Sequence, residues 1–412
     1  MNVLHFSTSD IEGGSARSAW RIHGGLKRSG VGSRMLVGSK SSNDPSVAAV
    51  AGDGWLQRAD TVSNIILQKL GLQYLYVPSS ARLARHPWVQ EADLFQLFNT
   101  HGGYFALDTL ARLGRRAPIV WRLSDLWPLT GHCAYPGDCV RWMDGCGQCP
   151  DLDAYPPIGR DTTAQLWRRK RVSYDQCDIT VIAPSSWTEA AARCSPLLAG
   201  RPVHRVPNGI DHAVFTPRGR QEARARLGIA DERLAILFAA HIAFDNPRKG
   251  SDLLLEALRM LGRREDVFLL VAGRNAERWR SQVPIDVVPL GYMEGDELLA
   301  DVYSAADVVC VPSAVENLPN IVLEAMACGT PVVAIDAGGM RDAVRDGDTG
   351  LLRPPGDPAA FATALARMLD DPEARRAMAG RALKMIRNEF TVEGEIARIR
   401  GIYEGILARR EA

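Results

Sequence analysis

Residues 311–333 of this 412-residue chain read VPSAVENLPNIVLEAMACGTPVV. The pattern predicts a buried strand that ends at Pro312, a polar loop, a helix, and a second buried strand after the turn at Gly329. Asn317 can cap the helix with Pro319 in its first turn, and Gly329 can end it. The helix would then begin at the carboxyl end of a strand, where its amides and its dipole favour an anion.

Two acidic residues eight positions apart, Glu316 and Glu324, accompany this helix. Glu316 lies just before the helix, and Glu324 lies about two turns further along. The residue types alone leave two interpretations open. One is a capped core helix with one solvated and one buried glutamate; the other is a carboxylate pair that binds a ligand.

Strand-like and helix-like segments alternate on both sides of this stretch. Alternation of this kind is typical of βαβ units and a parallel sheet. We expect strands at 3–7, 33–37, 94–98, 119–123, 179–183, 234–240, 267–272, 308–312 and 332–335, with helices at 16–29, 251–261 and 391–410.

The pattern restarts near residue 234, after a turn-rich junction at Val206–Asp211. The expected fold class is α/β, with two doubly wound parallel-sheet domains. Their predicted bounds are 1–205 and 206–390, and a final helix at about 391–412 is expected to pack back on the first domain or to cap the second. Ligands of such sheets bind at the carboxyl ends of the strands.

The composition narrows the classes of protein further. Apolar residues make up 46% and charged residues 24%, which excludes wholesale disorder. The net charge of +1 gives no reason to expect a nucleic-acid partner. No apolar run is long enough to span a membrane and the first residues do not resemble a signal peptide, so we expect a cytoplasmic protein.

Several blocks of the chain, in order, resemble glycosyltransferase family 4. The blocks are the E-x7-E stretch described above, Tyr303–Ser313, Gly338-Gly339, Asp346–Gly350, and the junction Pro207–Asp211 followed by Phe215-Thr-Pro217. The resemblance implies a GT-B fold, with two Rossmann-like domains that face each other across a cleft. It also implies a retaining transferase that uses nucleotide-diphospho-sugars and needs no metal for its chemistry.

The resemblance assigns roles to the two glutamates and to the residues that directly follow Glu316. Glu316 would contact hydroxyls of the donor sugar, and Glu324 would hold the ribose. Asn317 and Leu318 would lie against the donor, although Pro319 stands where family members often have a glycine and removes one amide donor.

A lysine follows the first strand of the second domain. Lys249 matches the family's diphosphate-binding lysine, whereas a solvated loop lysine is the alternative. The usual arginine position holds His241. Either Arg248 compensates for the missing arginine, or His241 itself bonds the phosphate. Arg274 is a weaker candidate for a base or phosphate contact.

In the first domain, Gly13 and Gly14 form the loop that reaches the donor or the acceptor in the family. Asp125 matches the family's His-Asp segment, in which Ser124 replaces the histidine. We expect Asp125 to contact the acceptor. His101 either contacts a sugar or only bonds loop backbone.

Four cysteines, Cys133, Cys139, Cys146 and Cys149, form a cluster, and the last two have the spacing of structural zinc sites. A similar insert follows the His-Asp segment in a bacterial subset of the family. Zinc would be structural. Two disulfides are the alternative, and a bundle of free thiols is expected less than either.

The function implied is transfer of a sugar from a nucleotide-diphospho-sugar to a glycan or lipid-linked acceptor, in surface polysaccharide synthesis. The alternatives are a sugar epimerase or phosphorylase on the same scaffold, and a non-catalytic nucleotide-sugar-binding subunit. The basic run Gln165–Arg171 is expected to be a solvated helix face, with peripheral contact to the inner membrane as the other interpretation.

Overall fold

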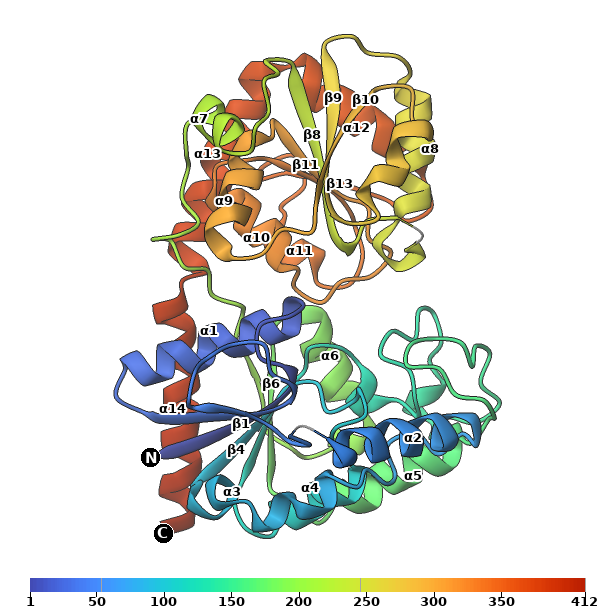
Figure 1. The fold of residues 1–412 in the computed structure, drawn as a ribbon, viewed down its shortest axis with the longest axis vertical. Coiled ribbons are helices and arrows are strands. Elements are labelled where there is room, and N and C mark those ends of the chain that lie inside the picture. The colour runs from blue at the N-terminus through green and yellow to red at the C-terminus, as the bar shows by residue number, and fades with distance from the viewer. Residues whose placement is uncertain (53, 245, 412) are drawn as a thin grey trace. The chain divides into compact units, whose positions relative to one another are not determined.

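The computed structural model describes residues 1–52, 54–244 and 246–411, which form two compact units (Figure 1). One unit consists of Met1–Pro207 together with Glu395–Ala412, and the other of Asn208–Gly394. The chain therefore passes between the units twice, once after β7 and once within the last helix.

The N-terminal unit contains a seven-stranded parallel sheet. In chain order its strands are β1 (Asn2–Ser9), β2 (Gly32–Ser39), β3 (Val47–Ala49), β4 (Leu94–Leu97), β5 (Ile119–Arg122), β6 (Ile179–Ala183) and β7 (Val203–Arg205). Their order in space is β3-β2-β1-β4-β5-β6-β7. The order therefore reverses between β1 and β4, and in doubly wound sheets the ligand crevice lies at such a point.

Helices and short 3-10 turns connect these strands. They are α1 (Gly14–Arg28), α2 (Trp55–Lys69), η1 (Ser80–Arg85), α3 (Pro87–Glu91), α4 (Leu107–Gly114), η2 (Trp127–Leu129), η3 (Arg141–Met143), α5 (Thr163–Tyr174), α6 (Ser186–Cys194) and η4 (Pro196–Leu198). The main core of the unit lies between the sheet and α4 and α5, where Leu4 and Phe6 of β1 point. Side chains alternate along a strand, so His5 and Ser7 point to the opposite face.

That opposite face is unusually polar for a buried surface. His5 and His23 of α1 both bond the hydroxyl of Ser33, at 2.9 and 2.7 Å. Further along the sheet, Arg122 of β5 pairs with Glu395 of α14 (Val392–Glu411) at 2.7 Å, and both side chains are almost fully buried. This ion pair attaches the last helix to the N-terminal sheet.

The C-terminal unit contains a six-stranded parallel sheet. Its strands are β8 (Leu234–Ile242), β9 (Val267–Arg274), β10 (Asp286–Gly291), β11 (Val308–Val311), β12 (Val332–Ile335) and β13 (Leu351–Arg353). They lie in the order β10-β9-β8-β11-β12-β13, which reverses between β8 and β11.

Two hydrophobic cores, one on each face, hold this sheet between its helices. Helices α8 (Ser251–Leu261) and α12 (Pro358–Asp370) cover one face. The other face carries α7 (Arg220–Arg226), α9 (Asp296–Ala305), α10 (Asn320–Ala327) and α13 (Pro372–Glu389). The short segments η5 (Pro247–Lys249), η6 (Ala276–Ser281) and α11 (Met340–Ala343) complete the unit.

The expected fold class is confirmed: both units are α/β domains built on parallel, doubly wound sheets. All nine predicted strands are present, and they are the interior strands of the two sheets. The strands that sequence analysis missed, β3, β7, β10 and β13, are the four edges. Among the described residues, no helix combines the length and the apolar character needed to cross a bilayer.

We predict that Glu395→Leu lowers the free energy of unfolding by about 3–5 kcal/mol, because it leaves Arg122 buried without a counter-charge. Chemical denaturation checks this value. Glu404→Leu is the matched control, since Glu404 lies exposed on the same helix beside Arg400 and its loss should change stability by less than about 1 kcal/mol. The double variant Arg122→Met/Glu395→Leu should recover most of the loss. If Glu395→Leu is as stable as the Glu404→Leu control, the ion pair does not hold the helix.

Candidate functional site

The residues of the predicted donor site gather at the carboxyl ends of β8 and β11, the two strands between which the sheet order reverses. Lys249 ends the 3-10 turn η5 after β8, and Glu316 lies in the loop after β11. The two loops are joined by a backbone hydrogen bond from the amide of Ala314 to the carbonyl of Arg248, 3.0 Å long.

Two glycines make this close approach possible. Gly250 has φ 73°, and a Cβ added there would lie 1.9 Å from the carbonyl oxygen of Pro312. Gly338 has φ 61°, and its added Cβ would lie 2.0 Å from the carbonyl oxygen of Glu316. Any other residue at either position would both strain the backbone and push the loops apart.

The ammonium of Lys249 forms an ion pair with the carboxylate of Glu316. A guanidinium nitrogen of Arg248 lies 3.7 Å from Oε1 of Glu316, the oxygen that pairs with Lys249. Burial alone would raise the pKa of Glu316, but the charges of Lys249 and Arg248 and hydrogen bonds from Lys249 and Ser313 bring it below its ordinary value. Glu316 is therefore a buried carboxylate held ionised by two cations.

Helix α10 begins two residues later than the sequence suggested. The predicted cap Asn317 and the expected start near Leu318 are wrong: the first helical residue is Asn320, and Pro319 precedes it with extended backbone. Proline disfavours helical backbone at the residue before it, so Leu318 cannot start the helix. Asn317 and Leu318 are both buried in the loop between Glu316 and the helix.

Asn208, which the sequence analysis did not single out, fixes this loop. Its side-chain amide donates to the carbonyl of Leu318 at 3.0 Å and to the side chain of Asn320 at 2.9 Å. The signals in the sequence were its place in the turn-rich junction at 206–211 and the resemblance of Pro207–Asp211 to the family.

The second acidic residue of the pair takes a different partner. Glu324 lies on α10 with 1% of its surface exposed, and it accepts a hydrogen bond of 2.9 Å from the hydroxyl of Tyr303. The structure thus places Glu324 inside the unit, next to α9, whereas Glu316 contacts the cations of the β8 loop.

His241 and Arg274 form a separate group around an aromatic ring. The ring of His241 meets that of Tyr292 edge-on, with 5.1 Å between centroids. The guanidinium of Arg274 lies over the same ring at 5.2 Å. These residues end or follow β8, β9 and β10, so they lie at the same edge of the sheet as the Lys249–Glu316 pair.

The N-terminal unit has a polar cluster at the equivalent place, after β1, β4 and β5. The carboxylate of Asp125 accepts hydrogen bonds from the amide of Trp127 at 2.9 Å, from His101 Nε2 at 2.8 Å and from the side chain of Asn99 at 3.3 Å. His101 and Asp125 are both 3% exposed. From the sequence we expected His101 to contact either a sugar or the loop backbone. In the structure its partner is the carboxylate of Asp125.

Ser15 connects this cluster to the first helix. Its hydroxyl donates to Asn99 at 3.0 Å and lies 2.7 Å from the hydroxyl of Ser124. Gly13 and Gly14 immediately precede it at the start of α1. Asn99 could have been found from the sequence, since it follows a predicted strand two residues before His101.

Lys170 binds the loop that follows Asp125. Its ammonium donates to the carbonyl of Thr130 at 2.9 Å, lies 3.4 Å from the ring centroid of Trp127, and bonds the carbonyl of the same residue. The predicted solvated face of the basic run is therefore wrong at this position, although Arg168 and Arg169 are exposed. Lys170 follows Leu166 by four residues, and this spacing places it on the buried stripe of α5.

All eight cysteines are free thiols. Burial raises the pKa of Cys133 to about 12 and that of Cys146 to about 11, and the Cys149 thiol lies 3.3 Å from Nε2 of His132. Within the described part of the chain, no three His, Cys, Asp or Glu side chains are arranged to hold a metal ion. This conformation does not fit a zinc site, and structural zinc stays a prediction.

We predict that the stability contributed by Lys170 rises with pH. Burial lowers its pKa to about 7 in the folded protein. An unfolded lysine keeps its proton until about pH 10.4, so the unfolded state binds more protons between these values. Relative to Lys170→Met, the wild type should gain about 2 kcal/mol between pH 7 and pH 9, measured by chemical denaturation.

The exposed Lys384 provides the control for that experiment. Lys384→Met should change the free energy of unfolding by less than about 1 kcal/mol, because this side chain is exposed. If the difference in the free energy of unfolding between the wild type and Lys170→Met falls as the pH rises, burial does not disfavour the charged form of Lys170.

Comparison with known proteins shows what the chain is similar to. Residues 219–385 match the family model described as glycosyl transferases group 1. A D-inositol 3-phosphate glycosyltransferase of Actinosynnema mirum is 40% identical over 194 residues, which cover 43% of this chain and 46% of that protein. The protein of that name from Acidothermus cellulolyticus is 33% identical over 249 residues, covering 56% of this chain and 54% of the relative. The chain thus spans about half the length of these curated relatives.

Solved structures match over nearly the whole chain. A sucrose-phosphate synthase from Thermosynechococcus elongatus superimposes with a TM-score of 0.71 at 21% identity, covering 99% of this chain and 100% of that one. Anabaena HepE in complex with UDP-glucose gives 0.70 at 18% identity, covering 98% and 100%. The C-terminal unit therefore contains a domain of the glycosyl transferases group 1 type, and the chain has the GT-B fold.

Proposed function

We propose that this protein is a retaining glycosyltransferase of family 4 that transfers a sugar from a nucleotide-diphospho-sugar to a hydroxyl group of its acceptor. The observation that carries the proposal is the Lys249–Glu316 pair at the point where the C-terminal sheet reverses its strand order. It combines a cation suited to phosphate with a carboxylate suited to sugar hydroxyls, at the edge where such sheets bind ligands.

A bound diphosphate would compete with Glu316 for Lys249, because both are anions. Lys249 and Arg248 would then bind the diphosphate, and the released carboxylate would accept hydrogen bonds from donor-sugar hydroxyls. The backbone at Asn317 and Leu318 and the start of α10 would add amides and a helix dipole near the leaving phosphate. No metal ion is needed for this charge balance.

The nucleoside would lie beside these groups. Tyr292, flanked by His241 and Arg274, offers an aromatic surface for the base. Glu324, which accepts a hydrogen bond from Tyr303, would hold the ribose by accepting further hydrogen bonds from its hydroxyls. The match to the group 1 model and the UDP-glucose complex of HepE, which has the same fold, support a nucleotide-sugar as the donor.

The acceptor would bind the N-terminal unit at Asp125 and His101, with Gly13 and Gly14 in the adjoining loop. Ser124 replaces the histidine of the family's His-Asp segment, but His101 brings an imidazole to the same aspartate from the loop after β4. The acceptor class proposed is a glycan or a lipid-linked glycan, in surface polysaccharide synthesis.

Retention of configuration would follow from a front-face reaction. The bond from the anomeric carbon to the leaving phosphate oxygen breaks, and the acceptor oxygen bonds the same face of that carbon. The departing phosphate takes the acceptor's hydroxyl proton, so no protein carboxylate has to act as a nucleophile. Lys249 and Arg248 stabilise the charge that develops on the leaving diphosphate.

Thermal-shift measurements with nucleoside diphosphates and nucleotide sugars test the donor class, because selective binding to the folded state raises the melting temperature. We predict that Lys249→Ala abolishes the shift and that Lys249→Ala and Glu316→Gln each reduce transfer at least 100-fold. Lys384→Ala, at an exposed lysine of α13, should keep both.

Near-normal transfer by both site variants would remove these residues from the mechanism. Phosphate-dependent cleavage or epimerised sugar without transfer would replace the function by that of a phosphorylase or an epimerase. Nucleotide-sugar binding that is never followed by release of free nucleotide would indicate a binding subunit.

A further inference from the structure

Helix α2 exposes several large apolar side chains to solvent and has a single buried residue, the acidic Asp60. Four of its apolar side chains point to solvent: Trp55 is 66% exposed, Val62 57%, Ile65 50% and Ile66 52%, whereas the shorter inner stripe of Leu56, Ala59 and Leu67 is partly buried. Trp55, Val62 and Ile66 are separated by seven and four residues, so they share one stripe of the helix. We call Trp55, Val62, Ile65 and Ile66 the α2 apolar face.

Three polar residues of α2 attach the helix to the unit. Asp60 is buried and accepts a hydrogen bond from the amide of Ser79 at 2.9 Å. Asn64 donates to the carbonyl of Gly103 at 2.7 Å, and Ser63 donates to the carbonyl of Tyr76 at 3.1 Å. Specific hydrogen bonds therefore fix the orientation that keeps the apolar face outward.

Arginine side chains lie next to the α2 apolar face. Arg82 of η1 lies over the Trp55 ring at 5.3 Å from its centroid, and the neighbouring carbonyl of Ala81 lies 3.5 Å from a guanidinium nitrogen of Arg112. Arg112 in turn lines a groove of about 530 Å³ between α4 and α5. These contacts make the α2 apolar face and the groove neighbours on one surface.

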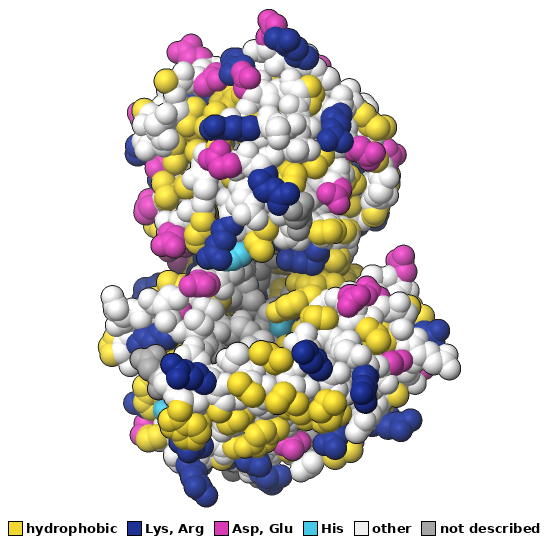
Figure 2. Space-filling model, turned by 45° about the vertical axis from the view of Figure 1, so that its right-hand side comes forward, with side chains coloured by type: hydrophobic (Ala, Val, Ile, Leu, Met, Phe, Trp, Pro, Cys, Tyr) yellow, Lys and Arg dark blue, Asp and Glu magenta, His cyan; other side chains and the backbone are white. Residues whose placement is uncertain are grey.

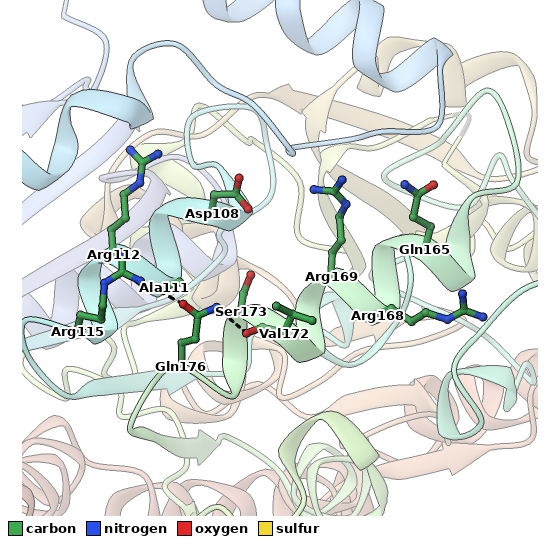
Figure 3. A pocket seen from close by; sticks show the side chains of 10 residues that line it. All are labelled: Asp108, Ala111, Arg112, Arg115, Gln165, Arg168, Arg169, Val172, Ser173 and Gln176. Carbon is green, nitrogen blue, oxygen red and sulfur yellow. Dashed lines mark hydrogen bonds between the residues drawn. The ribbon is translucent and has the colours of Figure 1, made fainter.

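The groove is strongly cationic (Figure 3). Its lining includes Arg112, Arg115, Arg168 and Arg169 but only one acidic residue, Asp108, among the ten lining residues. The guanidinium of Arg115 bonds Gln176 at 3.1 Å. On the N-terminal unit, Figure 2 shows a band of hydrophobic side chains with Lys and Arg side chains at its margins.

We propose that the α2 apolar face and the arginine groove together dock the protein on an anionic lipid bilayer, with α2 lying in the interface. A tryptophan and branched aliphatic residues on one stripe suit the boundary between headgroups and acyl chains. The flanking arginines suit anionic headgroups. At 15 residues the helix is about 22 Å long, which fits a helix that lies on a membrane rather than across it.

A second copy of the chain fits this surface less well. In a symmetric dimer the same patch lies on both sides of the interface, so the arginines of both copies would be brought into one interface without acidic partners from the patch. An anionic bilayer satisfies both the apolar stripe and the positive charge. This inference is independent of the proposed transfer reaction, because no residue of the donor or acceptor site takes part in it.

Flotation of the full chain with vesicles tests the proposal. We expect binding to vesicles of phosphatidylcholine with 30% phosphatidylglycerol, weak binding to phosphatidylcholine alone, and loss of binding as salt is raised, because screening weakens the headgroup contacts. Ile65→Ser/Ile66→Ser and Arg168→Gln/Arg169→Gln should each weaken binding about tenfold or more.

Matched controls lie in the other unit. Met260→Ser removes an apolar residue that is 55% exposed on α8, and Arg263→Gln removes an exposed arginine. Both should bind vesicles like the wild type, and thermal melts confirm that all four variants are folded. Equal vesicle binding by the α2 variant and the controls overturns the proposal.

Light scattering tests whether a second copy of the chain, rather than a bilayer, covers this surface. A wild-type dimer that Ile65→Ser/Ile66→Ser converts to a monomer, without vesicle binding by either, would make this face a self-interface and overturn the proposal. A monomer that binds no vesicle of either composition would also overturn it and would leave an acidic protein as the partner to seek.

Discussion

The strand order of the two parallel sheets is the constraint on which the rest of the structure depends. In each unit the order reverses once, between β1 and β4 and between β8 and β11. Connections on the two sides of a reversal leave toward opposite faces of the sheet, which opens a crevice at the carboxyl ends of the strands. The Lys249–Glu316 pair lies at one reversal and the Asp125 cluster at the other, so backbone topology selects the two places where these charged and polar side chains gather.

Charge is handled differently at these two places. At the C-terminal reversal, Glu316 is buried but paired with two cations, Lys249 and Arg248. In the N-terminal cluster, Asp125 is satisfied by a histidine, an asparagine and a backbone amide, and buried Lys170 holds the loop beneath it. The first arrangement suits an anionic ligand, and the second suits a ligand that offers hydroxyl groups.

The sequence predicted the parts of the fold that burial dictates. Interior strands of a parallel sheet are covered on both faces and form short apolar runs, as at 267–272 and 308–312. The edge strands β3, β7 and β13 have only three residues each, and β10 has no fully buried residue, so their patterns resemble loops. Contacts between segments that are distant in the sequence were not predicted either. Neither the bond from Asn208 to Leu318 nor the bond from His101 to Asp125 follows from local spacing. The cap at Asn317 failed because Pro319 delays the helix.

The central claim is that a diphosphate takes Lys249 from Glu316. A crystal structure of the full chain with a bound nucleoside diphosphate tests it most directly. The account predicts phosphate oxygens within hydrogen-bonding distance of Lys249 Nζ and a Glu316 carboxylate that no longer pairs with that ammonium. A nucleotide bound elsewhere, with the Lys249–Glu316 ion pair unchanged, would contradict it.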